Sequence, residues 1–406
     1  MNIHYIKQRV FLKYIILLLF IVFIYLFISK KDDIQITIVP GEKITTYGFA
    51  DISNMKYPNK SFIVIDDKTY PNMSQKLNAF KTAVKGNNFV IISGNIDLSN
   101  GKINDFDHSY FDEFNDDNTP QHKNFVVSIG SNTTLVGLKD ARIMYGEILL
   151  SNVENIIIQN ISFYDAHGAP EQNPKTNKQA KCSCDNIKVE KANNLWINHC
   201  SFSDGKCYDI YGNYHDGAID ITSGQNITIS YCHFTNHNKL ILLTPSDDFA
   251  KETNVYLTLH HNYFNNVIQR IPRARWANVH IYNNLYKNIG NKDRNFGYSL
   301  GIGIGCNFIV ENNFFENSQY AIIDWFDKSK IKEQSLALLY YKGNIPSLKD
   351  EIITYSQTDE LNNYKIHLKE EKVFIIPYYY ELEDSKLIKR KVAKYAGVKD
   401  KIEIRN

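Results

Sequence analysis

ITISYCHF, at residues 227–234, is one of six similar segments in the middle of the chain. Each segment opens on alternating apolar residues and closes on Phe or Tyr; the other five are IIIQNISF (156–163), LWINHCSF (195–202), LTLHHNYF (257–264), VHIYNNLY (279–286) and FIVENNFF (308–315). Successive segments start 39, 32, 30, 22 and 29 residues apart. Repeats of helix pairs would show an apolar period of about 3.6 residues, which these segments lack. Constant strands at irregular spacing predict a coil of parallel β-strands, with insertions confined to loops.

One position of the repeat carries Asn262, Asn284 and Asn313 on later turns and Cys200 and Cys232 on earlier ones. Identical residues stack in a parallel coil, so each Asn amide is expected to bond the Asn above and below it. Adjacent rungs lie about 4.8 Å apart, a separation that a disulfide between the two cysteines tolerates. Two stacked free thiols are the alternative. The chain has six cysteines, which fits either a disulfide-bonded exported protein or buried thiols.

We therefore predict an all-β fold, a single-stranded right-handed parallel β-helix with a short N-terminal capping helix. The coil is expected within a domain at residues 34–330, with regular turns from about residue 79. NAFKTAVKGN (78–87) is predicted to form a short helix, and the strand FVIISGNI (89–96) follows it. A helix in this place covers the first strand edge, which otherwise invites pairing with other chains.

The repeat fades after about residue 330, and the segment 331–406 is predicted to pack against the coil. This segment contains the strand-like VFIIPYYY (373–380) and the basic stretch KLIKRKVAK (386–394). The basic stretch is better explained as the solvated face of a helix than as a site for an anionic partner. GIGIG (301–305) lies between two repeat segments with no helix after it, so it is not a dinucleotide-binding loop.

Residues 1–33 form a separate N-terminal part, in which Lys7, Arg9 and Lys13 precede the apolar run Tyr14–Ile28. As a helix this run spans roughly 23 Å, which suits a short membrane anchor or the core of a signal peptide. No A-x-A cleavage site follows, so we favour an uncleaved anchor over a cleaved signal peptide, and both over a buried helix. The basic residues predict a cytoplasmic N-terminus and an exported remainder, in the periplasm or the extracellular space.

The composition excludes several classes of protein. The 406 residues carry a net charge of +2, with 43% hydrophobic and 22% charged residues. This balance is ordinary for a globular protein and excludes a disordered or collagen-like chain. A charge so close to zero gives no reason to expect a nucleic-acid partner, and we expect a monomer.

Acidic residues gather on neighbouring turns of the predicted coil. A shift of 32 residues, the spacing of two repeat segments, pairs strand 187–189 with strand 219–221 and sets Asp185 beside Gly217. The isoleucines at 219 and 221 point inward, so the residue between them points outward. Three carboxylates are therefore predicted on the outer surface of one sheet: Asp185, Asp216 and Asp220.

These carboxylates would repel one another without a cation, and a site of oxygen ligands alone suits Ca²⁺. Four residues of extended strand span roughly 13 Å, too far for Asp216 and Asp220 to share one ion. The chain must therefore bend between them, and Gly217 is the residue that permits it. The alternative is that the acids are exposed and form surface salt bridges with Lys188 and Lys239.

Four basic residues follow on the next turns: Lys239, Arg270, Arg273 and Arg275. Guanidinium groups bind carboxylates through two parallel hydrogen bonds, so these side chains and a cation are predicted to bind a polyanion. Positive charge beside a carboxylate also stabilises the enediolate that forms when the neighbouring carbon loses a proton.

Several motifs occur in a fixed order: FKTAVKGN, VIISGNI, TLVGLKDARI, WINHCSF, DGAIDIT, NITISYCHF, Lys239, LHHNYF, QRIPRARWANVHIYNN and, in the tail, KYAGVKD (394–400). Over residues 78–320 the sequence with these motifs resembles the pectate lyases of polysaccharide lyase family 1. The resemblance implies cleavage of α-1,4-linked polygalacturonate by Ca²⁺-dependent β-elimination, giving 4,5-unsaturated products.

By the same likeness, the Ca²⁺ ligands are Asp185, Asp216 and Asp220. Arg270 corresponds to the base that takes the C5 proton. Lys239 and Arg275 correspond to residues that bind the uronate carboxylate, and Arg273 lies beside them in the predicted substrate-binding group. His199 matches a structural position of the family.

Two departures from the family's motifs bear on substrate preference. Asn198 replaces an Asp of the family's WIDH motif, and Trp276-Ala277 replaces a glycine-containing pair, so Trp276 is expected to narrow the groove or stack on a sugar.

Two other functions are alternatives to a pectate lyase. A pectin lyase would act on esterified substrate without Ca²⁺, and its site is expected to lack the acidic trio. The other alternative is a non-catalytic, adhesin-like β-helix that binds polysaccharide.

Overall fold

The computed structural model describes residues 36–39, 46–51, 62–103, 125–138, 140–166, 185–205, 215–247, 255–291, 296–318, 322–325, 337–346, 366–399 and 402–405. The chain divides into two units, residues 1–43 with 400–406 and residues 44–399. In the first unit, β1 (Ile36–Val39) pairs in parallel with β26 (Ile402–Arg405).

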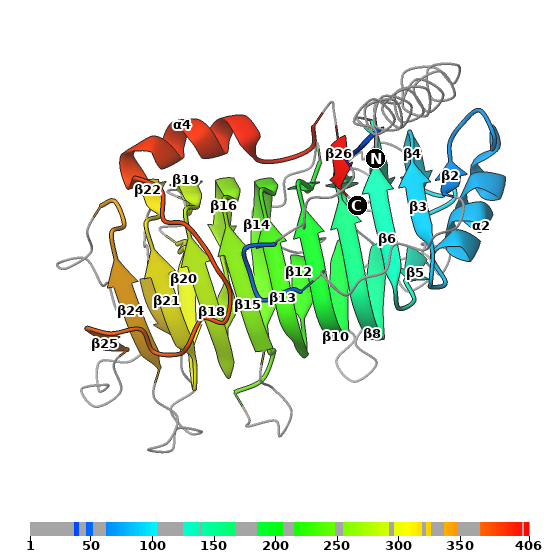
Figure 1. Cartoon of the computed structure of the whole chain (residues 1–406). Coiled ribbons are helices and arrows are strands. Elements are labelled where there is room, and N and C mark those ends of the chain that lie inside the picture. Colours follow the sequence, from blue (N-terminus) through cyan, green and yellow to red (C-terminus); the bar gives the residue numbers. More distant parts are fainter. Residues whose placement is uncertain are drawn as a thin grey trace, which may run out of the picture. The chain divides into compact units, whose positions relative to one another are not determined.

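The second unit is a coil of parallel strands (Figure 1), and the strand pairings divide it into three faces. The first face consists of β2 (Ile63–Ile65), β3 (Phe89–Ile92), β6 (Thr133–Gly137), β8 (Glu147–Gln159), β10 (Ile187–Asn198), β13 (Gly224–Ser230), β15 (Val255–His260), β18 (Ala277–Tyr282), β21 (Asn307–Glu311), β24 (Leu338–Lys342) and β25 (His367–Lys369). The second consists of β4 (Asn95–Asp97), β7 (Arg142–Met144), β9 (Ser162–Tyr164), β11 (Ser201–Ser203), β14 (His233–Leu243), β16 (Tyr263–Gln269), β19 (Leu285–Ile289) and β22 (Phe314–Ser318).

The third face combines the long strands β8, β10 and β14 with β5 (Val126–Ser128), β12 (Gly217–Ile221), β17 (Arg273–Ala274), β20 (Leu300–Gly303) and β23 (Ile322–Trp325). The predicted register is observed, since Ile197 pairs with Ile229 and Ile229 with Leu259 on successive rungs. These side chains are buried in one continuous apolar core. The predicted right-handed parallel β-helix is therefore confirmed.

The predicted asparagine ladder runs inside the coil. Asn262 Nδ2 donates to Asn284 Oδ1 at 3.0 Å, and Asn284 Nδ2 donates to Asn313 Oδ1 at 2.9 Å. Asn344, which the sequence did not indicate, extends the ladder by accepting from Asn313 Nδ2 at 2.8 Å. On the earlier turns, Cys200 and Cys232 are buried free thiols, so the alternative to a disulfide is the one observed.

Replacing Asn284 with Ala is expected to lower the free energy of unfolding by about 3 kcal/mol. The substitution leaves the backbone N–H of Asn262 and the carbonyl of Leu259 buried without their partner. Chemical denaturation followed by circular dichroism measures the change. Gln225→Ala, at an exposed position, is the control and should shift stability by less than about 0.5 kcal/mol. Equal stability of the two variants would contradict a structural role for the ladder.

The capping helix exists but differs in its limits from the prediction. Helix α2 spans Met73–Ala83, five residues earlier than expected at its start, because Asn72 caps it by accepting from the backbone N–H groups of Ser74 and Gln75. It buries Leu77 and Phe80 against the core. The first strand, β2, precedes the helix and pairs with β3. Figure 1 shows α2 beside β2, β3 and β4 at that end of the coil.

The coil continues past residue 330, because β24 and β25 add two further parallel rungs to the first face. The prediction of a strand at 373–380 was wrong: this segment is irregular. Pro377 lacks a backbone N–H for a ladder. Tyr378 instead places its hydroxyl 2.7 Å from both Thr258 Oγ1 and His280 Nδ1.

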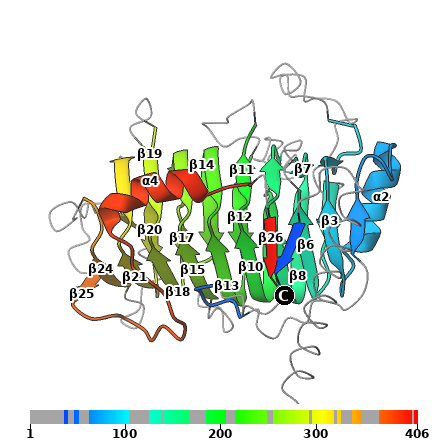
Figure 2. The ribbon, with the colours of Figure 1, turned by 45° about the horizontal axis from the view of Figure 1, so that its top comes forward.

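Helix α4 (Ser385–Tyr395) bears out the interpretation of the basic stretch as a solvated helix face. It buries Ile388 and Val392 against Leu285, and its basic residues face outward. Figures 1 and 2 show α4 lying across the strands β19 and β22 of the second face. As predicted, the segment GIGIG lies between strands and leads into no helix: β20 continues through a turn into β21.

The predicted N-terminal part, residues 1–33 with the run Tyr14–Ile28, lies outside the described residues. Within the described ranges, no helix has the length and apolar character needed to cross a membrane.

Candidate active site

The third face brings the predicted acidic and basic residues onto neighbouring rungs. Ile187 pairs with Ile219 and Val189 with Ile221, as the shift of 32 residues predicted. Asp220 pairs with Lys188 on one side and with Leu242 on the other, and Leu242 pairs with Arg273. Arg273 therefore lies two rungs, or roughly 10 Å, from Asp220 along the axis of the coil.

Asp185 lies two residues before the start of β10 and contacts the next rung. Its Oδ1 accepts a hydrogen bond of 2.7 Å from the backbone N–H of Gly217. A Cβ at position 217 would lie 2.7 Å from that same oxygen, so any other residue would push the carboxylate out of this position. Asp185 is only 3% exposed, which corrects the prediction of an outer-surface carboxylate. Burial raises the pKa of Asp185 well above its usual range, and the charges of Asp220 and Asp216 raise it further.

Asp220 lies within β12 and is mostly enclosed. Its Oδ1 is buried and makes no hydrogen bond with the described residues. Burial and then the charge of Asp216 raise the pKa of Asp220 to about 6, although Arg270 and Lys188 act in the opposite direction. A cation beside Asp220 would relieve both effects.

Glu147 is an acidic residue of the site that the sequence reasoning missed. It is buried at the start of β8, on the rung before Asp185. Its charge contributes to the raised pKa of both Asp185 and Asp220. The repeat register marks the apolar positions of β8, but it carries no signal that distinguishes this carboxylate from a surface one.

Asp216 lies just outside β12, because the strand begins at Gly217. Its Oδ1 is 2.7 Å from Lys239 Nζ and 3.8 Å from Arg270 Nη1. One of the salt bridges considered as an alternative to a metal site is thus present. Among the residues with described positions, no three Asp, Glu, His or Cys side chains are grouped closely enough to hold a metal ion.

The arginines differ in their surroundings. Arg270 has a positive φ of 63°, and its Nε is buried without a hydrogen bond to the described residues. Burial lowers the pKa of Arg273 to about 10. Arg275 is buried, with Nε paired to Asp247 and Nη1 donating to the carbonyl of Thr244 at 3.3 Å. Asp247 was not predicted, since nothing in the sequence links it to Arg275.

Trp276 follows the last arginine and is held by two contacts. Its Nε1 donates to the carbonyl of Asp247 at 3.2 Å. Its ring lies over Gly305, where a Cβ would come within 2.1 Å of ring atom Cε3.

His199, which the sequence assigns to a structural position, stacks on Tyr231 with ring centroids 5.0 Å apart.

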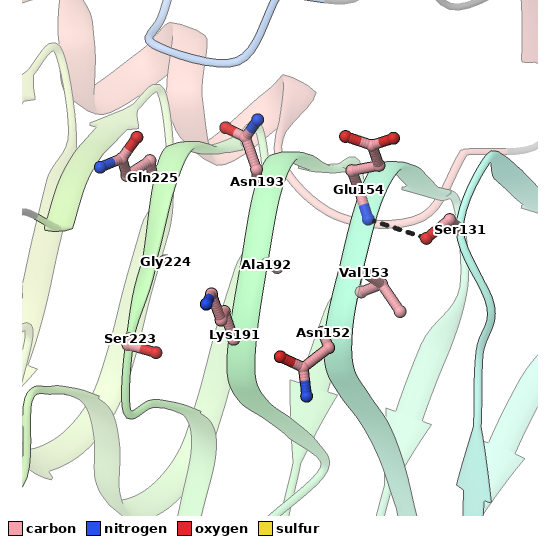
Figure 3. A pocket seen from close by; sticks show the side chains of 10 residues that line it. All are labelled: Ser131, Asn152, Val153, Glu154, Lys191, Ala192, Asn193, Ser223, Gly224 and Gln225. Carbon is pink, nitrogen blue, oxygen red and sulfur yellow. Dashed lines mark hydrogen bonds between the residues drawn. The ribbon is translucent and has the colours of Figure 1, made fainter. Parts of the chain in front are cut away.

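A separate groove of about 690 Å³ crosses β8, β10 and β13. Figure 3 shows Asn152, Lys191 and Ser223 in one row of its lining and a second polar row beside it. The second row is formed by Glu154, Asn193 and Gln225. None of the predicted site residues lines this groove.

One face of the parallel coil carries carboxylates, a lysine and three arginines. These features define a class of β-helix proteins with a highly charged surface site. The sequence model of one family, described as pectate lyase, matches residues 68–401, which is most of the chain. The chain therefore belongs to the pectate lyase family.

Individual relatives agree with this assignment. A pectate lyase of Bacillus subtilis is 34% identical over 211 residues, which cover 48% of this chain and 50% of that protein. A pectate trisaccharide-lyase of Thermotoga maritima is 38% identical over 164 residues, covering 39% of this chain and 41% of that protein. The chain thus spans about half the length, or less, of these curated relatives. The solved structure of a thermostable pectate lyase, PL 47, is 25% identical and has a TM-score of 0.62, with 89% of this chain and 99% of that one covered.

Proposed function

We propose that this protein is a pectate lyase that cleaves α-1,4-linked polygalacturonate by Ca²⁺-assisted β-elimination. The observation that carries the proposal is the mixed cluster on the third face: buried, mutually repelling carboxylates beside Lys239 and the arginines. Family membership supports the same reaction. A site built only to hold the coil together would have no need of carboxylates whose charges oppose one another.

The oxygen donors of the acidic residues fit a calcium ion in their chemistry. Their carboxylates would have to move closer together to share one, because no such group is formed among the described residues. Burial raises the pKa of both Asp185 and Asp220, and the charge of Asp216 raises both further. Asp220 Oδ1 makes no hydrogen bond among the described residues. A divalent cation would remove the repulsion, and oxygen-only ligands favour Ca²⁺ over softer metals. The residues that would hold it are Asp185, Asp216 and Asp220. When bound, Ca²⁺ withdraws electron density from the substrate's carboxylate and acidifies the neighbouring C–H.

Substrate binding is assigned to the basic residues of the later rungs. Lys239, Arg273 and Arg275 supply positive charge for the uronate carboxylates of the polymer. The contacts of Arg275 with Asp247 and with the Thr244 carbonyl fix the plane of its guanidinium group. Such a preorganised clamp loses little conformational entropy when the carboxylate binds.

Arg270 is assigned as the base. A nitrogen of Arg270 takes the C5 proton, and the electron pair of the C5–H bond moves into the uronate as an enediolate. The pair then forms the C4–C5 double bond, the C4–O bond breaks, and the leaving oxygen takes a proton from water. The nearby charges of Arg273, Arg275 and Lys239 stabilise the enediolate.

The decisive experiment incubates the purified protein with polygalacturonate in the presence of Ca²⁺ or of a chelator. The proposal expects an ultraviolet absorbance from the unsaturated product that rises only with Ca²⁺. New reducing ends without that absorbance would indicate hydrolysis instead. Binding without cleavage would favour the adhesin-like alternative, and Ca²⁺-independent cleavage of esterified pectin would favour a pectin lyase.

Export of the protein is part of the proposal. Its basis is the apolar run Tyr14–Ile28 behind basic residues, together with a polymeric substrate that does not enter cells.

Gly217→Ala is expected to reduce Ca²⁺ affinity about 10-fold while the coil stays folded. The new Cβ would lie 2.7 Å from Asp185 Oδ1 and so displace this ligand. Isothermal titration with Ca²⁺ measures the affinity, and Gln225→Ala, elsewhere on the coil, is the control. Unchanged affinity in Gly217→Ala would argue against Asp185 as a ligand.

A further inference from the structure

Two buried histidine–aspartate pairs lie where the chain turns from the second face into the third. His215 Nε2 is 2.8 Å from Asp165 Oδ1, and His237 Nε2 is 3.1 Å from Asp204 Oδ1. None of the four side chains is more than 2% exposed. A carboxylate only accepts hydrogen bonds, so the ring N–H of each histidine is the donor. Breaking either contact would take a hydrogen bond from a buried carboxylate, so both rings are held in place.

The two pairs occupy equivalent places on successive turns. The backbone N–H of Asp165 donates to the carbonyl of Ser203 at 2.9 Å, and the N–H of Asp204 donates to the carbonyl of Asn236 at 3.2 Å. Asp165 and Asp204 therefore lie one rung, or about 4.8 Å, apart. His237 directly follows Asn236 and bonds the aspartate of the preceding turn. The pair thus joins two neighbouring rungs.

The first histidine leads into the strand that carries the predicted metal ligands. His215 directly precedes Asp216, and its ring bonds Asp165 of the preceding turn. On the other side of Asp216, the backbone N–H of Gly217 donates to Asp185 Oδ1 at 2.7 Å. The residues before and after Asp216 are therefore both tied to the neighbouring turn, which fixes the backbone from which its carboxylate extends.

The second histidine stands close to the lysine of the site. His237 lies two residues before Lys239 in β14. The intervening residue is also held, because Asn238 Oδ1 accepts from Gln269 Nε2 at 2.9 Å. Lys239 Nζ in turn lies 2.7 Å from Asp216 Oδ1. The buried pairs therefore lie directly behind the two members of this ion pair of the candidate site.

We propose that the two histidines are positioning residues of the candidate site. His215, held by Asp165, sets the position of Asp216 for Ca²⁺ binding. His237 sets the position of Lys239 for the carboxylate of the substrate. The inference rests on the proposed lyase function. Groups that orient a ligand from behind cost roughly 10-fold or more in metal affinity when they are removed.

The first test compares His215→Asn with His215→Gln by isothermal titration of the purified protein with Ca²⁺. The amide N–H of Gln reaches the place of the ring Nε2–H and keeps the contact with Asp165, whereas Asn is one methylene too short. We expect the Kd for Ca²⁺ to rise about 10-fold in His215→Asn and to stay within about 2-fold of the wild type in His215→Gln. A wild-type Kd for His215→Asn would overturn the inference.

The second test makes the same exchange at the other histidine. His237→Asn should raise the KM for polygalacturonate about 10-fold while the Kd for Ca²⁺ changes less than about 2-fold, because Lys239 is the residue displaced. His280→Asn is the matched control: His280 Nε2 is likewise buried, 3.2 Å from Glu311 Oε2, but on the first face. It should keep the wild-type Kd and KM, whatever its effect on stability.

This division of effects excludes a merely structural role, which would not separate Kd from KM. Equal shifts of both quantities in His215→Asn and His237→Asn would therefore overturn the inference. If a histidine variant does not fold, Asp165→Asn or Asp204→Asn replaces it. An amide of the same size accepts a weaker hydrogen bond than a carboxylate, so the same quantity should shift about 3-fold, and no shift would again overturn the inference. A wild-type protein that binds no Ca²⁺ would instead refute the proposed function, and this inference with it.

Discussion

Arg270→Lys is expected to lower kcat by about 10³-fold while Ca²⁺-dependent binding of polygalacturonate persists. Lysine keeps the positive charge but loses the planar fork and the reach of the guanidinium group. It therefore cannot occupy the position set by the backbone at Arg270, where φ is 63°, and by Asp216. Steady-state rates from the absorbance of the unsaturated product, together with calorimetric binding, separate the two quantities.

Arg275→Lys is the matched control for that experiment. It makes the same exchange in an arginine assigned to carboxylate binding, and it breaks the paired contact with Asp247 and Thr244. We expect a loss between that of Arg270→Lys and the wild type, expressed mainly in KM. A normal kcat for Arg270→Lys would remove Arg270 as the base, whereas a raised KM alone would reduce its role to electrostatic binding of the polymer.

Asp220→Asn is expected to weaken Ca²⁺ binding by about 100-fold or more and to lower activity in proportion. The folded-state pKa of Asp220 is about 6, above the ordinary value of 3.8, so Asp220 lowers the stability of the metal-free protein progressively as the pH rises between these values, and the loss is complete above about pH 6. Asn carries no charge and removes this effect. At pH 7 and without Ca²⁺, the variant should therefore be at least as stable as the wild type.

Thermal unfolding with and without Ca²⁺, followed by calorimetric titration, measures both effects. The wild type should gain stability from Ca²⁺ by mass action, and Asp220→Asn should lose that gain. Glu190→Gln, an exposed neutral replacement on the neighbouring strand β10, is the control and should respond to Ca²⁺ as the wild type does. Equal Ca²⁺ affinity in Asp220→Asn and the wild type would take Asp220 out of the site.

The extent of what the sequence predicts is clear from the asparagine ladder. Asn262, Asn284 and Asn313 were placed on one line from the repeat alone, and they are joined by hydrogen bonds of 2.9–3.0 Å. Asn344 was not predicted because its rung lies beyond the last recognisable repeat segment. For the same reason, the limits of the coil at both ends were predicted least well. A terminal rung stacks on only one neighbouring rung, so its sequence follows the repeat less closely.

The candidate site shows the opposite case. The alternation of apolar residues indicates that Asp220 points away from the core, and the spacing of 32 residues brings Asp185 to Gly217. Neither pattern indicates that Arg275 pairs with Asp247. This partner comes from a loop, where no periodicity relates one residue to another.

By itself, the sequence determined the parallel coil, its register and the face that carries the charged residues, because burial of alternating apolar side chains allows only one register. Only the tertiary structure decided how deeply the carboxylates are buried, which arginine forms a close ion pair with an acidic residue and which arginine makes few polar contacts. The physical reason is that burial and electrostatic pairing depend on distances between side chains from separate turns, and apolar alternation along a strand does not encode those distances.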